Sequence, residues 1–218
     1  MTRKKLDPSV EIVAMARELD TAGLVPNKSG NLSCRTAGGF MITPSGVAYR
    51  TLEPEQIVKF DDHGTPAKGG LRPSSEWRMH AAIYACRPDV SAIVHTHSSN
   101  ATALACAGLG IPAFHYMIAL AGGAIRCVPY ATFGTAEIAA GAIEGLEGRR
   151  AVLLANHGVV TVGASLAAAQ AVAVEVENLA TQYLALRAAG LEPNVLDDAE
   201  LARVIEKFAD YGRITPGP

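Results

Sequence analysis

The segment from Asp89 to Thr96 constrains the fold most, because it reads as a β-strand with mostly apolar residues on both faces. Strands of this kind lie inside sheets that are covered on both sides. Side chains alternate along a strand, so His95 and His97 point to the same face, one pleat apart. Buried histidines need partners for their ring nitrogens, and two adjacent ones are hard to satisfy without a metal ion or an acid. The strand therefore predicts a covered sheet that carries half of a metal site.

Helix and strand signals alternate along the rest of the chain. Asp7-Pro8 reads as an N-cap followed by a proline in the first helical position, and Gly23 ends that helix. Interleaved helices and strands predict an α/β fold with a sheet covered on both faces. The predicted helices span about residues 7–23, 76–87, 98–108, 135–145, 165–189 and from 197 onward, and the predicted strands span 40–43, 57–60, 89–96, 125–128, 151–154 and 159–162.

The composition favours a single-domain cytoplasmic protein. We expect one domain over residues 1–218, with a loose tail at 213–218. The 19 basic and 21 acidic residues nearly balance, and no basic tract is present, so we expect no nucleic-acid partner. No apolar run is long enough to span a membrane, and the first residues lack the apolar core of a signal peptide. The cysteines are never in Cys-x-x-Cys spacing, which favours four reduced, buried thiols: Cys34, Cys86, Cys106 and Cys127.

A third histidine completes the candidate metal site. His157 lies in Asn156-His157-Gly158, at the exit of a predicted buried strand, where it is well placed to face a cleft. Three histidines with one open position are typical of catalytic zinc. His80, in contrast, favours a core or supporting role, and the solvent loop around His63 predicts an exposed side chain.

Several polar residues have ordinary structural interpretations when they are considered alone. Ser74 and Ser75 are N-cap candidates, and an acid such as Glu76 suits the first turn of a helix. Tyr116 fits the core. The glycine-bearing turns at residues 27–33 and 44–46 can direct backbone N–H groups toward an anion, although most such turns simply reverse the chain. The chain has neither a dinucleotide-binding fingerprint nor a P-loop, and its helices exclude an all-β cupin.

Taken together, these motifs resemble the class II, zinc-dependent sugar-phosphate aldolase family over essentially the whole chain. The similarity is greatest to the branch that cleaves L-fuculose 1-phosphate. It implies a class II aldolase/adducin-head-like α/β domain with a mixed or antiparallel central sheet. The segments that carry the resemblance are residues 30–33, 43–46, 73–78, 95–97, 111–117, 129–135, 156–158 and 206–212.

The resemblance implies a metal-dependent cleavage of a 2-ketose 1-phosphate to dihydroxyacetone phosphate and an aldehyde. His95, His97 and His157 would hold Zn²⁺, or Mn²⁺ or Co²⁺, with Glu76 as a fourth ligand when no substrate is present. The ion would stabilise an enediolate as a Lewis acid, and Glu76 would then act as general acid/base. No Schiff-base lysine is required.

Further residues receive roles from the same resemblance. Tyr116 would donate a proton to the aldehyde oxygen across a subunit boundary, and Tyr211 would close over the aldehyde. Both roles imply a homotetramer with active sites at the subunit interfaces. The phosphate would be held by Gly30, Asn31, Thr43, Ser45, Gly46, Ser74 and Ser75.

Other reactions on this fold remain open. The substrate could be a 5-deoxyribulose or methylthioribulose 1-phosphate, since Asn27-Lys28-Ser29 and Thr96 differ from the fuculose enzymes. Sugar-phosphate 4-epimerases and decarboxylases share the fold, but the epimerases carry Asp where this chain has Glu76. A non-catalytic scaffold is disfavoured, because it would be expected to lose the metal ligands or the acid that this chain retains.

Overall fold

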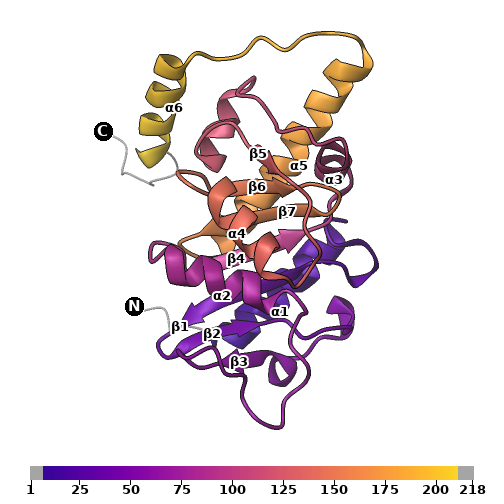
Figure 1. The fold of residues 1–218 in the computed structure, drawn as a ribbon, viewed down its shortest axis with the longest axis vertical. Helices are drawn as coiled ribbons and strands as arrows, with labels where there is room; N and C mark the ends of the chain where they lie inside the picture. Colours follow the sequence, from indigo (N-terminus) through magenta and orange to yellow (C-terminus); the bar gives the residue numbers. More distant parts are fainter. Residues whose placement is uncertain (1–6, 211–218) are drawn as a thin grey trace, which may run out of the picture.

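The computed structural model describes residues 7–210, and these form a seven-stranded mixed sheet with helices on both faces. The sheet order is β3-β2-β1-β4-β7-β6-β5, with β4 in the middle (Figure 1). All neighbouring strands pair antiparallel except β5 and β6, which are parallel. The strands are β1 (Asn31–Thr36), β2 (Gly39–Ile42), β3 (Val58–Phe60), β4 (Ala92–Thr96), β5 (Arg126–Val128), β6 (Ala151–Leu154) and β7 (Gly158–Gly163).

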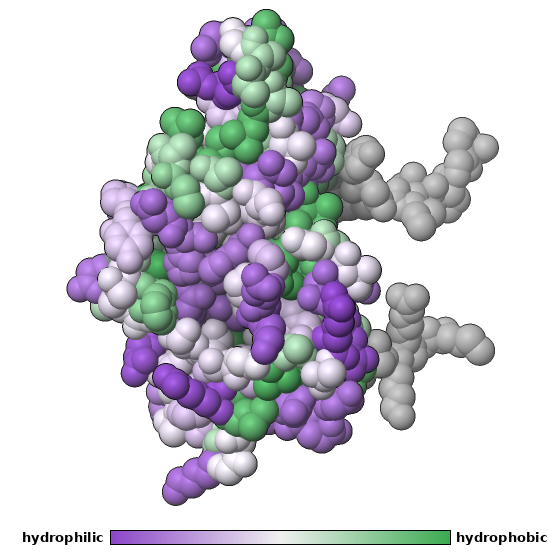
Figure 2. Space-filling model, turned by 90° about the vertical axis from the view of Figure 1, so that its right-hand side faces the viewer, coloured by the Kyte–Doolittle hydropathy of each residue, from purple (hydrophilic) through white to green (hydrophobic). Residues whose placement is uncertain are grey.

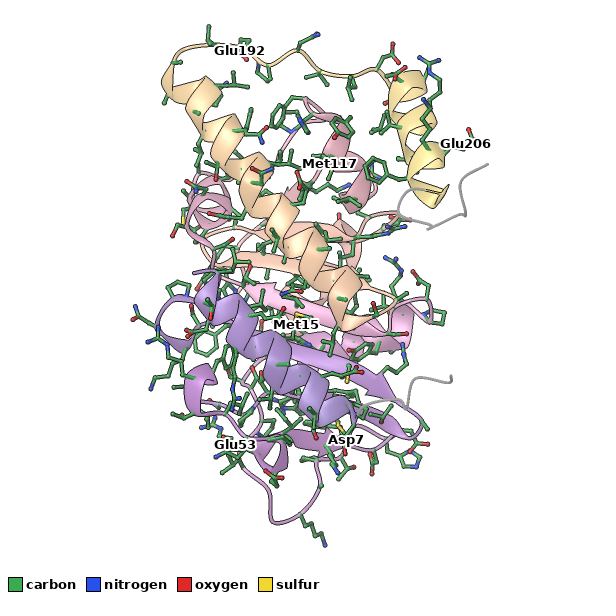
Figure 3. All side chains as sticks on the ribbon, turned by 180° about the vertical axis from the view of Figure 1, so that it is seen from behind. Asp7, Met15, Glu53, Met117, Glu192 and Glu206 are labelled. Carbon is green, nitrogen blue, oxygen red and sulfur yellow. The ribbon has the colours of Figure 1, made fainter. Side chains whose placement is uncertain are left out.

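Helices cover both faces of this sheet, as the sequence predicts. Helices α2 and α4 lie on the face toward the viewer in Figure 1, and α1 and α5 cover the opposite face, seen from behind in Figure 3. The α-helices are α1 (Pro8–Thr21), α2 (Trp77–Cys86), α3 (Ser99–Cys106), α4 (Ala136–Gly145), α5 (Leu166–Ala188) and α6 (Asp198–Asp210), and the 3-10 turns are η1 (Pro26–Lys28), η2 (Tyr49–Thr51), η3 (Pro54–Gln56) and η4 (Tyr116–Ala121).

The central strand β4 has the predicted alternation. Ile93 packs into the core beneath α2 and α4, whereas Ala92 and Val94 pack into the core beneath α1 and the first turns of α5. All five residues of β4 are buried. His97 follows directly after the strand, so both histidines lie at the end of a fully buried strand.

The predicted burial of the cysteines is wrong for all but one of them. The cysteines are free, but Cys86 and Cys106 are exposed, and of the four only Cys34 is buried.

The capping interpretation of the segment before α2 is also wrong. The helix begins at Trp77, which puts Glu76 in the N-cap position, and the carboxylate makes no capping hydrogen bond. Ser74 Oγ instead accepts a hydrogen bond from the Glu76 N–H, at 3.3 Å. The Glu76 side chain is therefore free to point toward the sheet.

The C-terminal part packs above the sheet. Helix α6 follows an extended connection and packs against η4 (Figure 1). The predicted tail at 213–218 and Tyr211 lie outside the described residues. Within residues 7–210, no helix combines the length and apolar character needed to cross a bilayer.

Candidate active site

Three imidazoles converge at the end of the central strand. His95 lies in β4, His97 follows it, and His157 lies in the turn between β6 and β7. Strand β7 pairs with β4 so that His95 is opposite Val160, which brings the β6–β7 turn beside the end of β4. One ligand atom from each histidine lies within 4.8 Å of the others. The three rings meet edge to face, with centroids 4.8 to 4.9 Å apart.

A glycine makes this convergence possible. A Cβ atom at Gly158 would lie 2.5 Å from the Thr96 carbonyl oxygen and 2.9 Å from His97 Cδ2. Any larger residue would push the β6–β7 turn away from β4. Asn156 adopts a left-handed conformation with φ of 56°, which turns the chain sharply before His157.

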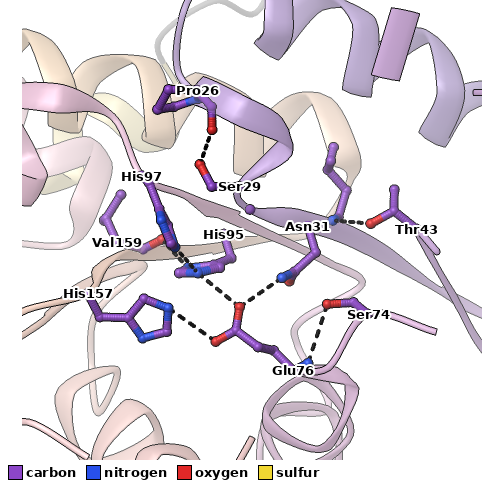
Figure 4. A network of polar contacts seen from close by, with 12 residues as sticks. Pro26, Ser29, Asn31, Thr43, Ser74, Glu76, His95, His97, His157 and Val159 are labelled. Carbon is purple, nitrogen blue, oxygen red and sulfur yellow. Dashed lines mark hydrogen bonds and ion pairs between the residues drawn. The ribbon is translucent and has the colours of Figure 1, made fainter. Parts of the chain in front are cut away.

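Glu76 reaches into the same cluster from the start of α2. Its carboxylate lies 3.1 Å from His95 Nε2 and 3.3 Å from His157 Nε2, and it accepts a hydrogen bond of 2.9 Å from Asn31 Nδ2 (Figure 4). The residue is only 6% exposed. Burial alone would raise the pKa of this carboxyl, but the charge and hydrogen bond of His95, together with His157, hold the pKa well below its usual range. Glu76 is therefore an anion at neutral pH.

Two of the three imidazoles are in the neutral form that binds a metal ion. Burial and repulsion from His95 lower the pKa values of His97 and His157 to about 4, so both rings are neutral at pH 7. Burial also lowers the pKa of His95, but Glu76 and the Val159 carbonyl raise it, and the net shift is upward. Since His95 Nδ1–H donates to the Val159 oxygen at 2.9 Å, its Nε2 is the atom that a metal ion would take.

The donor set fits a divalent metal ion. The Nε2 atoms of His95 and His97 are only 3.0 Å apart, and Glu76 Oε1 is buried without a hydrogen-bond partner among the described residues. Three imidazole nitrogens and one carboxylate oxygen match the ligand preference of zinc. A buried, partly unsatisfied group of this kind is costly unless an ion compensates it.

A pocket of about 340 Å³ opens beside this cluster. It contains six of the seven residues that the resemblance assigns to phosphate binding: Gly30, Asn31, Ser45, Gly46, Ser74 and Ser75. Thr43 is the exception, since it is 1% exposed and its Oγ1 accepts a hydrogen bond from the Leu32 N–H within the sheet. Thr43 therefore holds β1 through Leu32, and its contact with the phosphate stays a prediction.

Lys28, Tyr130 and Phe133 are among the pocket-lining residues that the sequence does not assign to the site. Tyr130 and Phe133 have 60% and 62% of their surfaces exposed. The segment 129–135 carries part of the family resemblance, and two aromatic residues in a loop between β5 and α4 were the available signal. Lys28 belongs to the segment Asn27-Lys28-Ser29, which the sequence marks only as a difference from the fuculose enzymes.

The two tyrosines predicted for the site, Tyr116 and Tyr211, are not among the described residues that line the pocket. Tyr116 is not part of the core, because it is 52% exposed on η4, and it does not line the pocket of its own chain. Its ring lies 6.2 Å from that of Phe208 in α6. Tyr211 is outside the described residues, so its predicted role stays a prediction.

His80 is a buried supporting residue, as its position on α2 predicts. It is fully buried, and its Nδ1 is 2.7 Å from Ser33 Oγ, which in turn lies 2.7 Å from the Tyr84 hydroxyl. Burial and repulsion from His95 lower the pKa of His80 to about 3. The ring is therefore neutral and supports α2 against β1. His63 is exposed, as expected.

The chain is similar to characterised aldolases along most of its length. The family model described as Class II Aldolase and Adducin N-terminal domain matches residues 10–184. The chain is 51% identical, over 203 residues, to the 5-methylthioribulose-1-phosphate/5-deoxyribulose-1-phosphate aldolase of Rhodospirillum rubrum, which covers 92% of this chain and 90% of that protein. It is 44% identical to the L-fuculose phosphate aldolase of Escherichia coli, over 97% of this chain and 98% of that protein.

A solved structure agrees with these similarities. An L-fuculose 1-phosphate aldolase superposes with a TM-score of 0.90 at 40% identity, covering 94% of this chain and 98% of its own. Sequence and fold therefore give the same answer, and the chain belongs to the class II aldolase family.

Proposed function

We propose that this aldolase cleaves a 2-ketose 1-phosphate reversibly to dihydroxyacetone phosphate and an aldehyde. One observation carries the proposal: three imidazoles and a buried carboxylate converge beside a pocket that is also lined by serine hydroxyl groups and two glycine turns. Such a pocket offers a cation site and an anion site side by side. A phosphorylated hydroxyketone needs both.

His95, His97 and His157 would hold Zn²⁺, with Glu76 as a fourth ligand before substrate binds, and Mn²⁺ or Co²⁺ would suit the same donors. When bound, the ion supplies positive charge that stabilises negative charge on the ketose oxygens during bond cleavage. The hydrogen bond from His95 Nδ1 to Val159 orients the first ring for this role.

Glu76 would move the proton at carbon. Cleavage of the C3–C4 bond leaves negative charge on the dihydroxyacetone half, and C3 must then gain a proton. The Glu76 carboxylate is within hydrogen-bonding reach of two imidazoles, and Asn31 Nδ2 holds one of its oxygens. A positioned acid/base of this kind contributes roughly 10²- to 10⁴-fold in rate.

The phosphate would lie at the opposite end of the pocket. Ser45 and Gly46 form one turn, with φ of 79° at Gly46, and Ser74 and Ser75 precede α2. These residues present hydroxyl and amide groups, and the N-terminus of α2 at Trp77 adds the positive end of its dipole.

The end of the pocket that binds the aldehyde half of the substrate would require a residue from a second subunit. Tyr116 is exposed and lies outside its own pocket, so a neighbouring chain would supply it as the proton donor to the aldehyde oxygen, with Tyr211 closing nearby. Exposed apolar residues gather in this part of the chain, including Leu191 and Val195, and Figure 2 shows hydrophobic patches toward the upper end of one face. We therefore propose a homotetramer with sites at the subunit interfaces.

A pentulose 1-phosphate with an apolar C5 substituent is the first candidate substrate. The relative from R. rubrum, named for 5-methylthioribulose and 5-deoxyribulose 1-phosphates, shares a higher fraction of identical residues with this chain than the fuculose enzyme of E. coli does. The exposed rings of Tyr130 and Phe133 suit a methyl or methylthio group. L-fuculose 1-phosphate is the second candidate, because the fold match is to an enzyme of that name. Four free cysteines suit the reducing cytoplasm as the place of the reaction.

A substrate panel tests the proposal. The purified protein is incubated with 5-deoxyribulose, 5-methylthioribulose and L-fuculose 1-phosphates, and dihydroxyacetone phosphate is measured by an NADH-linked assay. We expect release from at least one substrate, with the highest kcat/KM for a 5-substituted pentulose. Epimerised or decarboxylated products without dihydroxyacetone phosphate would assign the chain to another branch of the family, and a protein without metal or activity would be a scaffold.

A further inference from the structure

The pocket has one positively charged side chain among the described residues that line it. Lys28 lines the pocket together with Ser29 and Gly30, and the serines proposed for phosphate binding line the same pocket. Glu76, an anion, lines it as well. A phosphate ester carries about −1.5 to −2 charges at neutral pH. Hydroxyl and amide groups can hydrogen-bond it but cannot neutralise it.

The backbone holds Lys28 in an unusual conformation. Asn27 and Lys28 are consecutive non-glycine residues with φ of 53° and 65°. This left-handed region is unfavourable for residues with a Cβ, and lysine, unlike asparagine, has no short polar group to compensate locally. Strain of this kind persists when surrounding structure imposes it, and it concentrates at functional sites.

Neighbouring contacts impose this left-handed conformation on Asn27 and Lys28. The Ser29 N–H and hydroxyl both donate to the Pro26 carbonyl, which closes the turn (Figure 4). Gly30 then packs against β4, where a Cβ atom would lie 2.5 Å from the His95 carbonyl oxygen. The turn is thus fixed between α1 and the metal cluster, and Lys28 is carried to the pocket.

The ammonium group is available for a ligand. Lys28 is exposed, and within residues 7–210 it forms no ion pair. Exposed lysines are common, but this one combines a strained backbone with a position on the lining of the candidate active-site pocket. These observations are independent of each other.

We propose that Lys28 binds the phosphate group of the substrate and is the cation that makes this pocket selective for phosphorylated ketoses. The proposal rests on the proposed function for the identity of the substrate. The serine hydroxyls and the amide of Gly46 position the phosphate oxygens, and Lys28 neutralises their charge. The pocket then binds the dianion from one side by hydrogen bonds and from the other by an ion pair.

Calorimetric titration with inorganic phosphate tests the assignment without any need for turnover. Lys28→Met removes the charge and keeps most of the length, Lys28→Arg keeps the charge, and Lys68→Met removes an exposed lysine from the loop between β3 and α2 as a matched control. We expect the Kd for phosphate to rise about 10- to 100-fold in Lys28→Met, the range for loss of one charge-assisted hydrogen bond. Lys28→Arg should stay within about fivefold, and Lys68→Met should match the wild type. Equal phosphate affinity in Lys28→Met and wild type would overturn the assignment.

Kinetics separate this inference from the proposed function. With a cleaved ketose 1-phosphate, Lys28→Met should raise KM by a similar factor and change kcat by less than about threefold, since the ion pair forms equally in ground and transition states. A fall in kcat at unchanged KM would overturn the assignment. If the wild type binds phosphate through Lys28 but cleaves no ketose 1-phosphate, the proposed reaction fails and the Lys28 site stands.

Discussion

Replacing Glu76 with glutamine isolates the proposed proton transfer. The substitution keeps the shape of the side chain and leaves the three imidazoles in place. It removes a charge that now lies 3.1 Å from His95 and 3.3 Å from His157. The amide can still accept the hydrogen bond from Asn31, so we expect the fold and a bound metal ion to be retained. Loss of a general acid/base lowers turnover by roughly 10²- to 10⁴-fold, or about 3 to 5 kcal/mol in the activation barrier.

Two assays measure this loss at different steps. Turnover is followed by release of dihydroxyacetone phosphate from the preferred ketose 1-phosphate. Exchange of deuterium from heavy water into dihydroxyacetone phosphate alone reports the proton step without an aldehyde. Glu76→Gln should lose both activities in parallel, whereas Glu55→Gln, at an exposed position of η3, should keep them. Full exchange activity in Glu76→Gln would refute the proton-transfer role and leave the carboxylate as a structural group.

Four further substitutions or conditions test other parts of the account. Tyr116→Phe should lower kcat by about 10²-fold and leave phosphate affinity unchanged, and an unaltered kcat would remove this tyrosine from the reaction. Gly158→Ala should lower the free energy of unfolding in urea by about 1 to 3 kcal/mol and weaken metal binding, since the added Cβ would lie 2.9 Å from His97 Cδ2; equal stability would show that the turn can move. Lys28→Gly should raise the free energy of unfolding by about 0.5 to 1 kcal/mol, because glycine adopts a φ of 65° without strain. A lower free energy of unfolding would show that the backbone at Lys28 is not strained. The metal-free protein should lose stability as pH falls from 6.5 toward 3, because the unfolded chain protonates His80 while the folded chain, with its pKa of about 3, does not. Urea unfolding of His80→Asn should show a pH slope smaller by up to about 1.4 kcal/mol per unit, and an identical slope would exclude this histidine as the cause.

The sheet and its helices could be predicted because their signals are local. Apolar residues on both faces of β4 indicate a central strand, and Asp7-Pro8 marks the start of α1, where the Asp7 carboxylate does accept from the Ser9 N–H. Helical turn η4 could not be predicted in the same way. Its six residues are too few to show a helical periodicity, and burial of Ile118 against distant residues decides its conformation.

The site was predictable in its chemistry but not in all of its geometry. The spacing of His95 and His97 indicates a shared face, whereas the approach of His157 depends on the pairing of β7 with β4, which is a long-range event. Thr43 fits a motif beside Ser45, yet the sheet register turns its side chain into the interior. Lys28 follows from backbone angles that only the structure supplies.

Metal content tests the central claim most directly. Elemental analysis of the purified wild type should find close to one divalent ion per chain, and His63→Ala, which changes an exposed loop histidine, should match it. His97→Ala should lose the ion and the cleavage activity together, because two imidazoles and one carboxylate hold it far more weakly. Retention of one ion per chain in His97→Ala, or full activity of a chelator-treated wild type, would contradict a metal centre built on these three histidines.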